Sequence, residues 1–570
     1  MKLRTSYFNG SVLKKDITRF LPVWGLYSVF LFMALLILNW DSAPAETAYA
    51  ANNIIAFTSV INFIYAFICA GTLFGDLYVS KMCNALHAMP MRREGWFLTH
   101  FAAGFLFSFL PNLLAAAASY PLLRENYFVA YIWLGASTLQ FLFFFGLALL
   151  CTFCVGNRLG LAALYGILNF FAQLVYGFIS ALYLPLLKGV TLSWDAFAPF
   201  SPVVQMACGG YVDIVLQFDD FNQSALFKGF IAADWNYLFL MAATGIVLTV
   251  VALMLYRFRH LERAGDFLAF KGLAPVFLGI VTLASGLVFY MLVNMMTGRK
   301  SYLFLVIGMA VGFFVAKMLL EQTVRVFRRK PVIAFVILTA VTLGSFYVTH
   351  LDPMKLQEKI PAADEIETCR LNMVYPSPYQ MTDTSRNIDE IRDIHQQLIT
   401  AEPVADSGRY PVSISYTLKN GKNLTRKYTV YEKSPISQQI ERMQSAWSVV
   451  FQTDDFDSFA SSIRTMQADL WDRGLGIPDV WDATIPEQYH PELLAAMKAD
   501  CEEGTLAQGY MFYDKELIAQ IRYDFAVDTH TEGLEDYHRS GSIEIPGEAK
   551  NTRQVLDKIM ADIRPTDGIR

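Results

Sequence analysis

The stretch YIWLGASTLQFLFFFGLALLCTFCV, residues Tyr131–Val155, runs for 25 residues without a charged side chain. About 20 mainly apolar residues are enough for a helix to cross the hydrocarbon layer of a bilayer. An uninterrupted run of this length is typical of a transmembrane helix, because a helix on the surface of a soluble domain has a polar face as well as an apolar one. The segment therefore predicts that the chain enters a membrane.

Similar apolar segments recur along the first 350 residues, and we count nine in all. They are Leu21–Trp40, Asn53–Gly75, Phe97–Tyr120, Tyr131–Val155, Leu161–Leu187, Tyr237–Tyr256, Ala274–Met296, Tyr302–Lys317 and Val332–Thr349. We expect the first to be retained rather than cleaved as a signal peptide, since no small-residue cleavage site follows it. The pattern predicts an α-helical polytopic membrane protein with about nine spans.

Composition and charge divide the chain into two parts. Of its 570 residues, 54% are hydrophobic and only 17% are charged, which excludes a string of ordinary soluble domains. Residues 1–350 carry a net charge of +9, whereas residues 351–570 carry a net charge of −14. We expect the first part to lie in a bilayer and the second in water.

The distribution of Lys and Arg predicts how the spans are oriented. Cytoplasmic loops of membrane proteins are enriched in these residues. With a cytoplasmic N-terminus, the interior segments carry 18 Lys and Arg residues and the exterior loops carry five. The nine spans then place residues 350–570 outside the cell, so the sequence predicts a multi-pass protein of the cell membrane with an extracellular C-terminal domain.

No Asp, Glu, Lys, Arg or His lies deep within a predicted span. Ion-coupled transporters need such groups near the middle of the membrane, so their absence argues against that class. Neutral polar residues do occur there, among them Asn62, Asn169 and Gln173. Either these amides form hydrogen bonds between helices, or they line a translocation path, with Asn169 and Gln173 four residues apart on one helical face.

The chain also lacks the sequence of a nucleotide-binding loop. Its one Gly-Lys pair, Gly421-Lys422, is followed by Asn423 instead of the Ser or Thr that such a loop requires. We therefore expect no cofactor on this chain, and ATP with Mg on another chain if ATP drives the protein.

Two segments on the cytoplasmic side carry the most specific pattern. In residues 1–20, apolar residues gather on one helical face and basic residues on the other, which indicates either an amphipathic helix in the membrane interface or a charged tail. The second segment, GDLYVSKMCNALHAMPMRREGWFLTHFAAGF (Gly75–Phe105), combines a short helical run, Pro90 and a charged Arg92–Glu94 cluster before the third span.

These segments resemble a permease of the type-2 membrane family of ABC exporters, as found in Gram-positive, Clostridia-like bacteria. In that family an interfacial helix precedes span one, and a short cytoplasmic coupling helix joins spans two and three. Residues of this chain that match the ATPase-coupling segment are Lys81, Leu86, Pro90, Met91, Arg92, Arg93 and Glu94. The alternative is that the arginines only anchor span three among lipid headgroups.

The resemblance implies a domain plan and a set of partners. Residues 1–20 correspond to the interfacial helix and 21–265 to a six-span permease core, which leaves 266–349 as three additional spans and 350–570 as an additional extracellular domain. The family implies a separate cytoplasmic ABC ATPase, a second permease chain in a homo- or heterodimer, and contact with membrane lipids. It implies no nucleic-acid partner.

Residues 350–570 read as an α+β domain. Alternating residues from Val412 to Val430 around Asn420-Gly421 predict a β-hairpin, residues 388–399 and Asn551–Ile563 predict helices, and 509–513 and Ala519–Val527 predict strands. No metal-binding or catalytic motif is present, so we expect no metal site and no catalytic residues. The acidic charge favours either recognition of cationic peptides or simple solubility, and a Cys369–Cys501 disulfide stays open.

The sequence thus predicts a transport subunit and not an enzyme. The expected function is export of an amphipathic peptide or lipid-like substrate, driven by a separate ATPase. The alternative is a membrane sensor or resistance protein whose extracellular domain binds a peptide.

Overall fold

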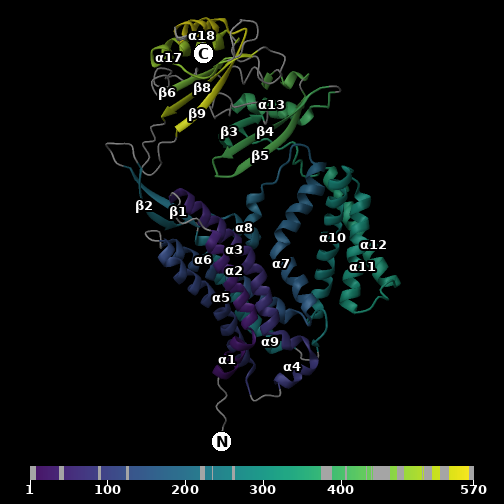
Figure 1. Cartoon of the computed structure of the whole chain (residues 1–570). Coiled ribbons are helices and arrows are strands. Elements are labelled where there is room, and N and C mark those ends of the chain that lie inside the picture. Colours follow the sequence, from purple (N-terminus) through teal and green to yellow (C-terminus); the bar gives the residue numbers. More distant parts are fainter. Residues whose placement is uncertain are drawn as a thin grey trace. The chain divides into compact units, whose positions relative to one another are not determined.

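The computed structural model gives the arrangement of most of the chain. It describes residues 8–37, 44–87, 91–123, 128–218, 225–233, 235–259, 263–373, 388–404, 407–431, 433–437, 439–440, 463–470, 480–503, 505, 517–526 and 538–563. The chain forms two compact units (Figure 1). The membrane unit comprises residues 1–182 and 193–346, and the C-terminal unit comprises residues 183–192 and 347–570.

Each predicted span corresponds to a helix of the membrane unit. In the described residues these helices are α2 (Leu21–Ile37), α3 (Pro44–Leu73), α5 (Arg93–Leu123), α6 (Phe128–Cys154), α7 (Arg158–Phe178), α9 (Trp235–Phe258), α10 (Ala274–Thr297), α11 (Tyr302–Glu321) and α12 (Arg329–His350). All but α2 are long and apolar enough to cross a membrane alone, and α2 passes together with α1 (Gly10–Arg19), from which it bends by 61°. The chain is thus a multi-pass helical membrane protein.

Glycines allow two pairs of these helices to approach closely. Where α6 meets α9, a Cβ added to Gly245 would lie 2.5 Å from the carbonyl oxygen of Leu142, and one added to Gly146 would collide with the backbone of Gly245. Gly308 and Gly312 of α11 pack in the same way against α10. Small residues suit such contacts, since helices in lipid associate through close van der Waals packing.

The predicted cytoplasmic loops meet at one end of the membrane unit. The loop between α6 and α7 pairs with the segment after α9, where the amide of Ala269 donates to the carbonyl of Cys154 at 2.9 Å and that of Gly265 to Gly156 at 2.8 Å. The Gln322 side chain, after α11, also donates to Gly265, at 2.6 Å. These loops share one side, as the alternation of spans requires.

The connection between α7 and α9 contains structure that sequence reasoning did not predict. It consists of a π-helical turn η3 (Ile179–Tyr183), the 3-10 turns η4 (Leu184–Leu186), η5 (Trp194–Ala196) and η6 (Ala198–Phe200), helix α8 (Pro202–Cys208), and strands β1 (Val212–Phe218) and β2 (Ala225–Ala232). The two strands form an antiparallel hairpin. Asn52 of α3 holds its base, because its side-chain oxygen accepts from the amides of Tyr211 and Val212 at 2.7 and 2.8 Å.

The C-terminal unit contains two modules whose order of elements is the same apart from one additional strand, β7, in the second. The first has strand β3 (Ile366–Met373), helix α13 (Ile388–Thr400), strands β4 (Arg409–Leu418) and β5 (Asn423–Tyr431), and helical residues at 435–437 and 439–440. The second has β6 (Ile463–Leu470), β7 (Val480–Thr484), α17 (His490–Glu502), β8 (Leu517–Ala526), β9 (His538–Pro546) and α18 (Lys550–Ile563). Further short helices in the described part of the chain are η1 (Gly75–Tyr78), α4 (Ser80–His87), η8 (Lys271–Leu273), η9 (Ala363–Glu365) and η10 (Glu487–Tyr489).

Sheet topology shows that the two modules repeat one βαββα pattern. In the first, β3 pairs with β4 and β4 with β5, all antiparallel. In the second, β6 pairs with β8 and β8 with β9 in the same way, and β7 is added to the free edge of β6. Each module has its own apolar core. The expected hairpin and the helices at 388–399 and 551–563 are present, and β8 confirms the strand expected from Ala519 as far as Ala526.

Two sequence-level expectations for this unit fall on residues that are not fully described. The strand expected at 509–513 lies outside the described residues. Cys369 is buried in the core of the first module, but the side chain of Cys501 is outside the described part, so their pairing stays a prediction.

A buried histidine organises the core of the first module. His395 of α13 lies between two tyrosines, with Nδ1 2.9 Å from the hydroxyl of Tyr416 and Nε2 2.9 Å from that of Tyr428. Burial lowers the pKa of His395 to about 4, and the positive charge of Arg426 acts in the same direction. The imidazole is therefore neutral in the folded module near neutral pH.

The α6–α9 contact gives a first prediction. Gly245→Val places two methyl groups against backbone atoms that have no room to move, and we expect a loss of about 1–3 kcal/mol in stability. The matched control is Gly166→Val on α7, where an added Cβ meets nothing within 4 Å. The midpoint of thermal unfolding of the purified chain in detergent measures the effect, and equal midpoints for the two variants would contradict the packing described.

The neutral state of His395 gives a second prediction. An unfolded chain protonates histidine below a pH of about 6.5, whereas the folded module resists protonation until about pH 4. The stabilising contribution is complete above pH 6.5 and is lost as pH falls towards 4. As pH falls from about 7 to about 5, we expect hydrogen exchange of the α13 amides to accelerate, after correction for intrinsic exchange rates. The acceleration should be smaller in His395→Gln. An equal acceleration in both proteins would show that other titratable groups cause it.

Candidate functional site

The N-terminal helix α1 is fastened to the start of α5. Its N-cap residue Asn9 accepts hydrogen bonds from the amides of Ser11 and Val12 at 3.0 and 3.3 Å. The Asn9 amide donates to the Thr99 hydroxyl of α5 at 3.2 Å, and its side-chain nitrogen lies 3.5 Å from the sulfur of Met91. A cap that also binds a second helix fixes both where α1 begins and where it lies.

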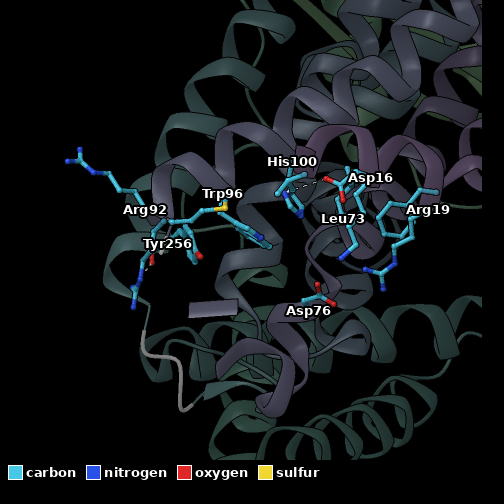
Figure 2. Close-up of a pocket in the computed structure, with 13 residues that line it drawn as sticks. Asp16, Arg19, Leu73, Asp76, Arg92, Trp96, His100 and Tyr256 are labelled. Atoms are coloured by element: carbon cyan, nitrogen blue, oxygen red, sulfur yellow. Dashed lines mark hydrogen bonds and ion pairs between the residues drawn. The ribbon is translucent and has the colours of Figure 1, made fainter. Parts of the chain in front are cut away.

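One carboxylate of α1 points inward. Asp16 is 5% exposed, and its Oδ2 lies 3.6 Å from Nδ1 of His100, which is also 5% exposed. Figure 2 shows the two side chains pointing toward each other. Neither atom has a hydrogen-bond partner in the described structure. A buried carboxylate is costly unless a partner stabilises it, and burial raises the pKa of Asp16 to about 6, which the positive charges of Arg19 and Lys15 only partly oppose.

A cavity of about 440 Å³ opens beside this pair. Its wall is formed by residues of α1, the end of α3, the start of α5 and the end of α9: Val12, Lys15, Asp16, Arg19, Phe20, Leu73, Asp76, Met91, Arg92, Arg93, Trp96, His100 and Tyr256. Of the charged residues, four are basic and two are acidic. In Figure 2 the Arg92 side chain points away from the Asp16–His100 pair. The cavity joins the interfacial helix to the predicted coupling segment.

The short helix that the sequence predicts between the second and third spans is α4, eight residues long. Lys81 and Met82 are exposed on α4, Met82 by 47%, and Val79, which precedes the helix, is 52% exposed. Cys83 faces inward and is buried. The side chain of Leu86 and all of Pro90 lie outside the described residues.

The remaining residues of the predicted coupling segment lie just before and at the start of α5, and two of them, Arg93 and Glu94, contact the end of α9. Nη1 of Arg93 donates to the carbonyl oxygens of Tyr256 and Arg257 at 3.4 and 3.3 Å. Glu94 forms an ion pair with Arg257 at 3.0 Å. Met91 contacts Asn9, and Arg92 is exposed. Arg93 and Glu94 therefore bind within the chain and stiffen the base of the coupling segment.

A buried arginine joins the loops on which α4 stands. Arg259, just after α9, is 4% exposed. Its guanidinium donates to the carbonyl of Thr152 near the end of α6 at 3.0 Å and to that of Leu77 in η1 at 3.4 Å. Ser80, the first residue of α4, donates through its hydroxyl to Ala264 at 3.3 Å. The segments after α3, α6 and α9 are thus connected to one another.

Asn62, predicted as a path residue, lies in a buried network that connects four helices. Its oxygen accepts from the hydroxyl of Tyr27 in α2 at 2.8 Å. Its nitrogen lies 3.1 Å from the Ser137 hydroxyl and 3.2 Å from the Gln140 oxygen, both on α6. Asn112 of α5 donates to the same tyrosine at 3.0 Å. These contacts match the first of the two interpretations, hydrogen bonds between helices.

Asn169 and Gln173 have fewer partners. Asn169 is fully buried, and in the described structure its side chain donates to the carbonyl of Tyr165 on its own helix, at 2.9 Å. The oxygen of Gln173 accepts a hydrogen bond from Ser201, which precedes α8. The oxygen of Asn169 and the nitrogen of Gln173 are buried without a hydrogen-bond partner in the described structure. An acceptor and a donor one turn apart on α7 thus have unused capacity.

Comparisons and metal chemistry add no further assignment. No protein-family model, curated protein or solved structure matches the chain. Among the described residues, no group of three His, Cys, Asp or Glu side chains is placed to hold a metal ion. The functional interpretation therefore depends on the residues themselves.

Sequence reasoning missed the Asp16–His100 pair, although α1 carries a signal for it. Asp16 follows Val12 by four residues and precedes Phe20 by four, so it lies on the apolar face of an otherwise basic amphipathic helix. A carboxylate in that position needs a partner on the surface that the face covers. Nothing local to α1 indicates that the partner is a histidine 84 residues away.

The pair gives a third prediction. Asp16→Asn keeps the shape of the side chain and removes a buried charge, so near neutral pH we expect α1 to stay docked more firmly and trypsin to cleave at exposed Lys14 and Lys15 about tenfold more slowly, which corresponds to about 1.4 kcal/mol. Asp76→Asn is the control, because Asp76 lines the same cavity without facing His100. Unchanged or faster cleavage in Asp16→Asn would show that the buried charge does not weaken the docking of the helix.

Proposed function

We propose that this chain is the membrane-spanning permease subunit of an ATP-binding-cassette exporter, and that a separate cytoplasmic ATPase drives it. The observation that carries the proposal is α4, a short helix between two spans whose outer surface is exposed and whose base is braced. The arrangement supports a role as the coupling helix, since a subunit without a nucleotide site must receive force through a rigid projection.

The outer surface of α4 suits a protein partner better than a lipid headgroup. Val79 and Met82 present apolar side chains beside the ammonium group of Lys81. Methionine is enriched at the centres of protein interfaces, so Val79 and Met82 supply the apolar part of a small docking surface. Arg93, Glu94 and Arg259 hold the segment from behind, so a push on α4 is passed to α3, α5 and α9.

On this proposal, helix α7 is the best candidate for the wall of the translocation path. The amides of Asn169 and Gln173 have unused hydrogen-bonding capacity, whereas Asn62 uses its own between helices. The substrate class that we propose is an amphipathic peptide or lipid-like molecule, and a second permease chain, identical or related, would complete the path. The cell membrane with a cytoplasmic N-terminus and an extracellular C-terminal unit is the location we propose.

The repeated βαββα modules favour one second candidate. A duplicated module joined to a membrane unit is also suited to a sensor or resistance protein that binds a peptide outside the cell. ATP-dependent transport into membrane vesicles separates the two functions, because a sensor stimulates an ATPase without moving cargo.

The docking surface on α4 gives a fourth prediction. Met82→Asp places a charge within it, and we expect the ATPase that co-purifies with the full chain to be lost and ATP hydrolysis in the purified material to fall about tenfold or more, as for a central interface residue. The matched control is Met354→Asp, which changes an 80% exposed methionine in the C-terminal unit.

The outcomes of this experiment are separable. Loss of hydrolysis in Met82→Asp alone supports α4 as the coupling helix. If no ATPase co-purifies with the unaltered chain, or if both variants retain it equally, the proposed function is wrong.

A further inference from the structure

Ten residues between two membrane helices belong to the C-terminal unit. Residues 183–192, which we call the strap, follow the π-helical end of α7 and cluster with residues 347–570. The chain therefore passes between the two units at three points and not one, after residues 182, 192 and 346. A domain attached only by its terminal linker would need a single crossing.

The strap binds the free edge of β5 in the first module through an isolated β-bridge and two neighbouring hydrogen bonds. Val190 forms an antiparallel bridge with Arg426 of β5. The amide of Lys427 donates to the carbonyl of Gly189 at 3.1 Å, and the Thr191 hydroxyl donates to the carbonyl of Thr425 at 2.6 Å. An exposed edge strand offers unpaired amides and carbonyls, and the strap pairs with those of β5.

A lysine and a glycine fix the position of the strap. The ammonium group of Lys188 donates to the carbonyl of Ile399 at 3.0 Å and to that of Ala401, at the end of α13. A positive charge is favourable there because it satisfies the last carbonyls of the helix and opposes its dipole. Gly189 has a φ of +76°, and an added Cβ would collide with the ring of Tyr428.

The strap is thereby connected to the buried core of the module. Tyr428, which packs on Gly189, bonds through its hydroxyl to His395 at 2.9 Å, and His395 bonds to Tyr416 at the same distance. A change in the packing of α13 therefore reaches the strap through two neighbouring contacts.

At its other end the strap continues into the least regular part of a membrane helix. Ile179–Tyr183 form a π-helical turn and Leu184–Leu186 a 3-10 turn. Such irregular turns commonly mark functional segments in helices. A cavity of about 130 Å³ with apolar walls lies between this end of α7 and α10, so the end of α7 has space in which to shift.

The point at which the chain passes to the C-terminal unit for the second time, after Phe346, also lies beside the end of α7. The ring of Phe178, the last residue of α7, lies 6.3 Å from that of Phe346, the last residue of the membrane unit. Four helices that are long and apolar enough to cross a membrane, α9 to α12, separate the strap from residue 351 in the described chain. An even number returns the chain to the same side, as the pairing of the strap with β5 requires.

We propose that the strap is a mechanical link between the first module and α7, so that a change of packing or occupancy in the C-terminal unit changes the conformation of the end of α7. The link does not depend on the proposed transport function, although the same helix carries Asn169 and Gln173. A sensor and an exporter would both use it.

Hydrogen exchange of the full chain in lipid nanodiscs tests this fifth prediction. His395→Ala loosens the module core without touching the strap, and we expect amide exchange across residues 179–186 to rise about tenfold, the change produced by about 1.4 kcal/mol of lost local stability. Gly189→Val breaks the link, so adding His395→Ala to Gly189→Val should produce no further rise at these residues.

Two further variants keep the test decisive. Gly421→Val is the matched control, because Gly421 has the same φ of +76° in the same module but no atom within 4 Å of an added Cβ; in that background His395→Ala should still act on α7. Tyr428→Phe, which removes only the hydroxyl bound to His395, replaces His395→Ala if the latter does not fold. Exchange that rises in α13 but not at 179–186, or rises equally with and without Gly189→Val, overturns the proposal.

Discussion

The bonds made by the Arg259 guanidinium are the interaction on which the predicted cytoplasmic end depends. This buried side chain binds the carbonyls of Thr152 and Leu77, and so joins the segments that follow α9, α6 and α3. A bilayer supplies no water to satisfy free backbone groups, so carbonyls at helix ends need partners from the protein. Because these segments are connected, α4 stands on a firm base, and the proposed role of α4 follows from that firmness.

The predicted cytoplasmic end and the interior of the membrane unit differ in how the chain uses polarity. At the predicted cytoplasmic end, charged groups bind one another or the backbone, as in Glu94–Arg257 and Arg93–Tyr256. In the interior, neutral amides such as Asn62 connect helices instead. Within the C-terminal unit, the strap pairs with the backbone of β5. Neutral hydrogen bonds suit the interior of the membrane unit, since they cost less free energy to bury than ion pairs.

The sequence predicted the elements that depend on a local pattern of residues. The spans follow from apolar runs, and the β4–β5 hairpin follows from alternation around Asn420-Gly421. It did not predict features that depend on distant partners. Asp16 reveals its role only beside His100, and the strap resembles an ordinary loop because Lys188 and Gly189 gain meaning only from α13 and Tyr428. The repeat of the βαββα modules was hidden as well, since their strands share a topology and not an evident sequence.

The central claim is that a motor in the cytosol works this chain through α4 while the C-terminal unit lies outside the cell. Trypsin added to intact cells and to inverted membrane vesicles tests it most directly. The account predicts that external trypsin cleaves within residues 350–570 and spares Lys81, and that trypsin at the cytoplasmic face does the reverse. Cleavage of residues 350–570 only in the inverted vesicles would contradict the account, because α4 would then face away from any ATPase.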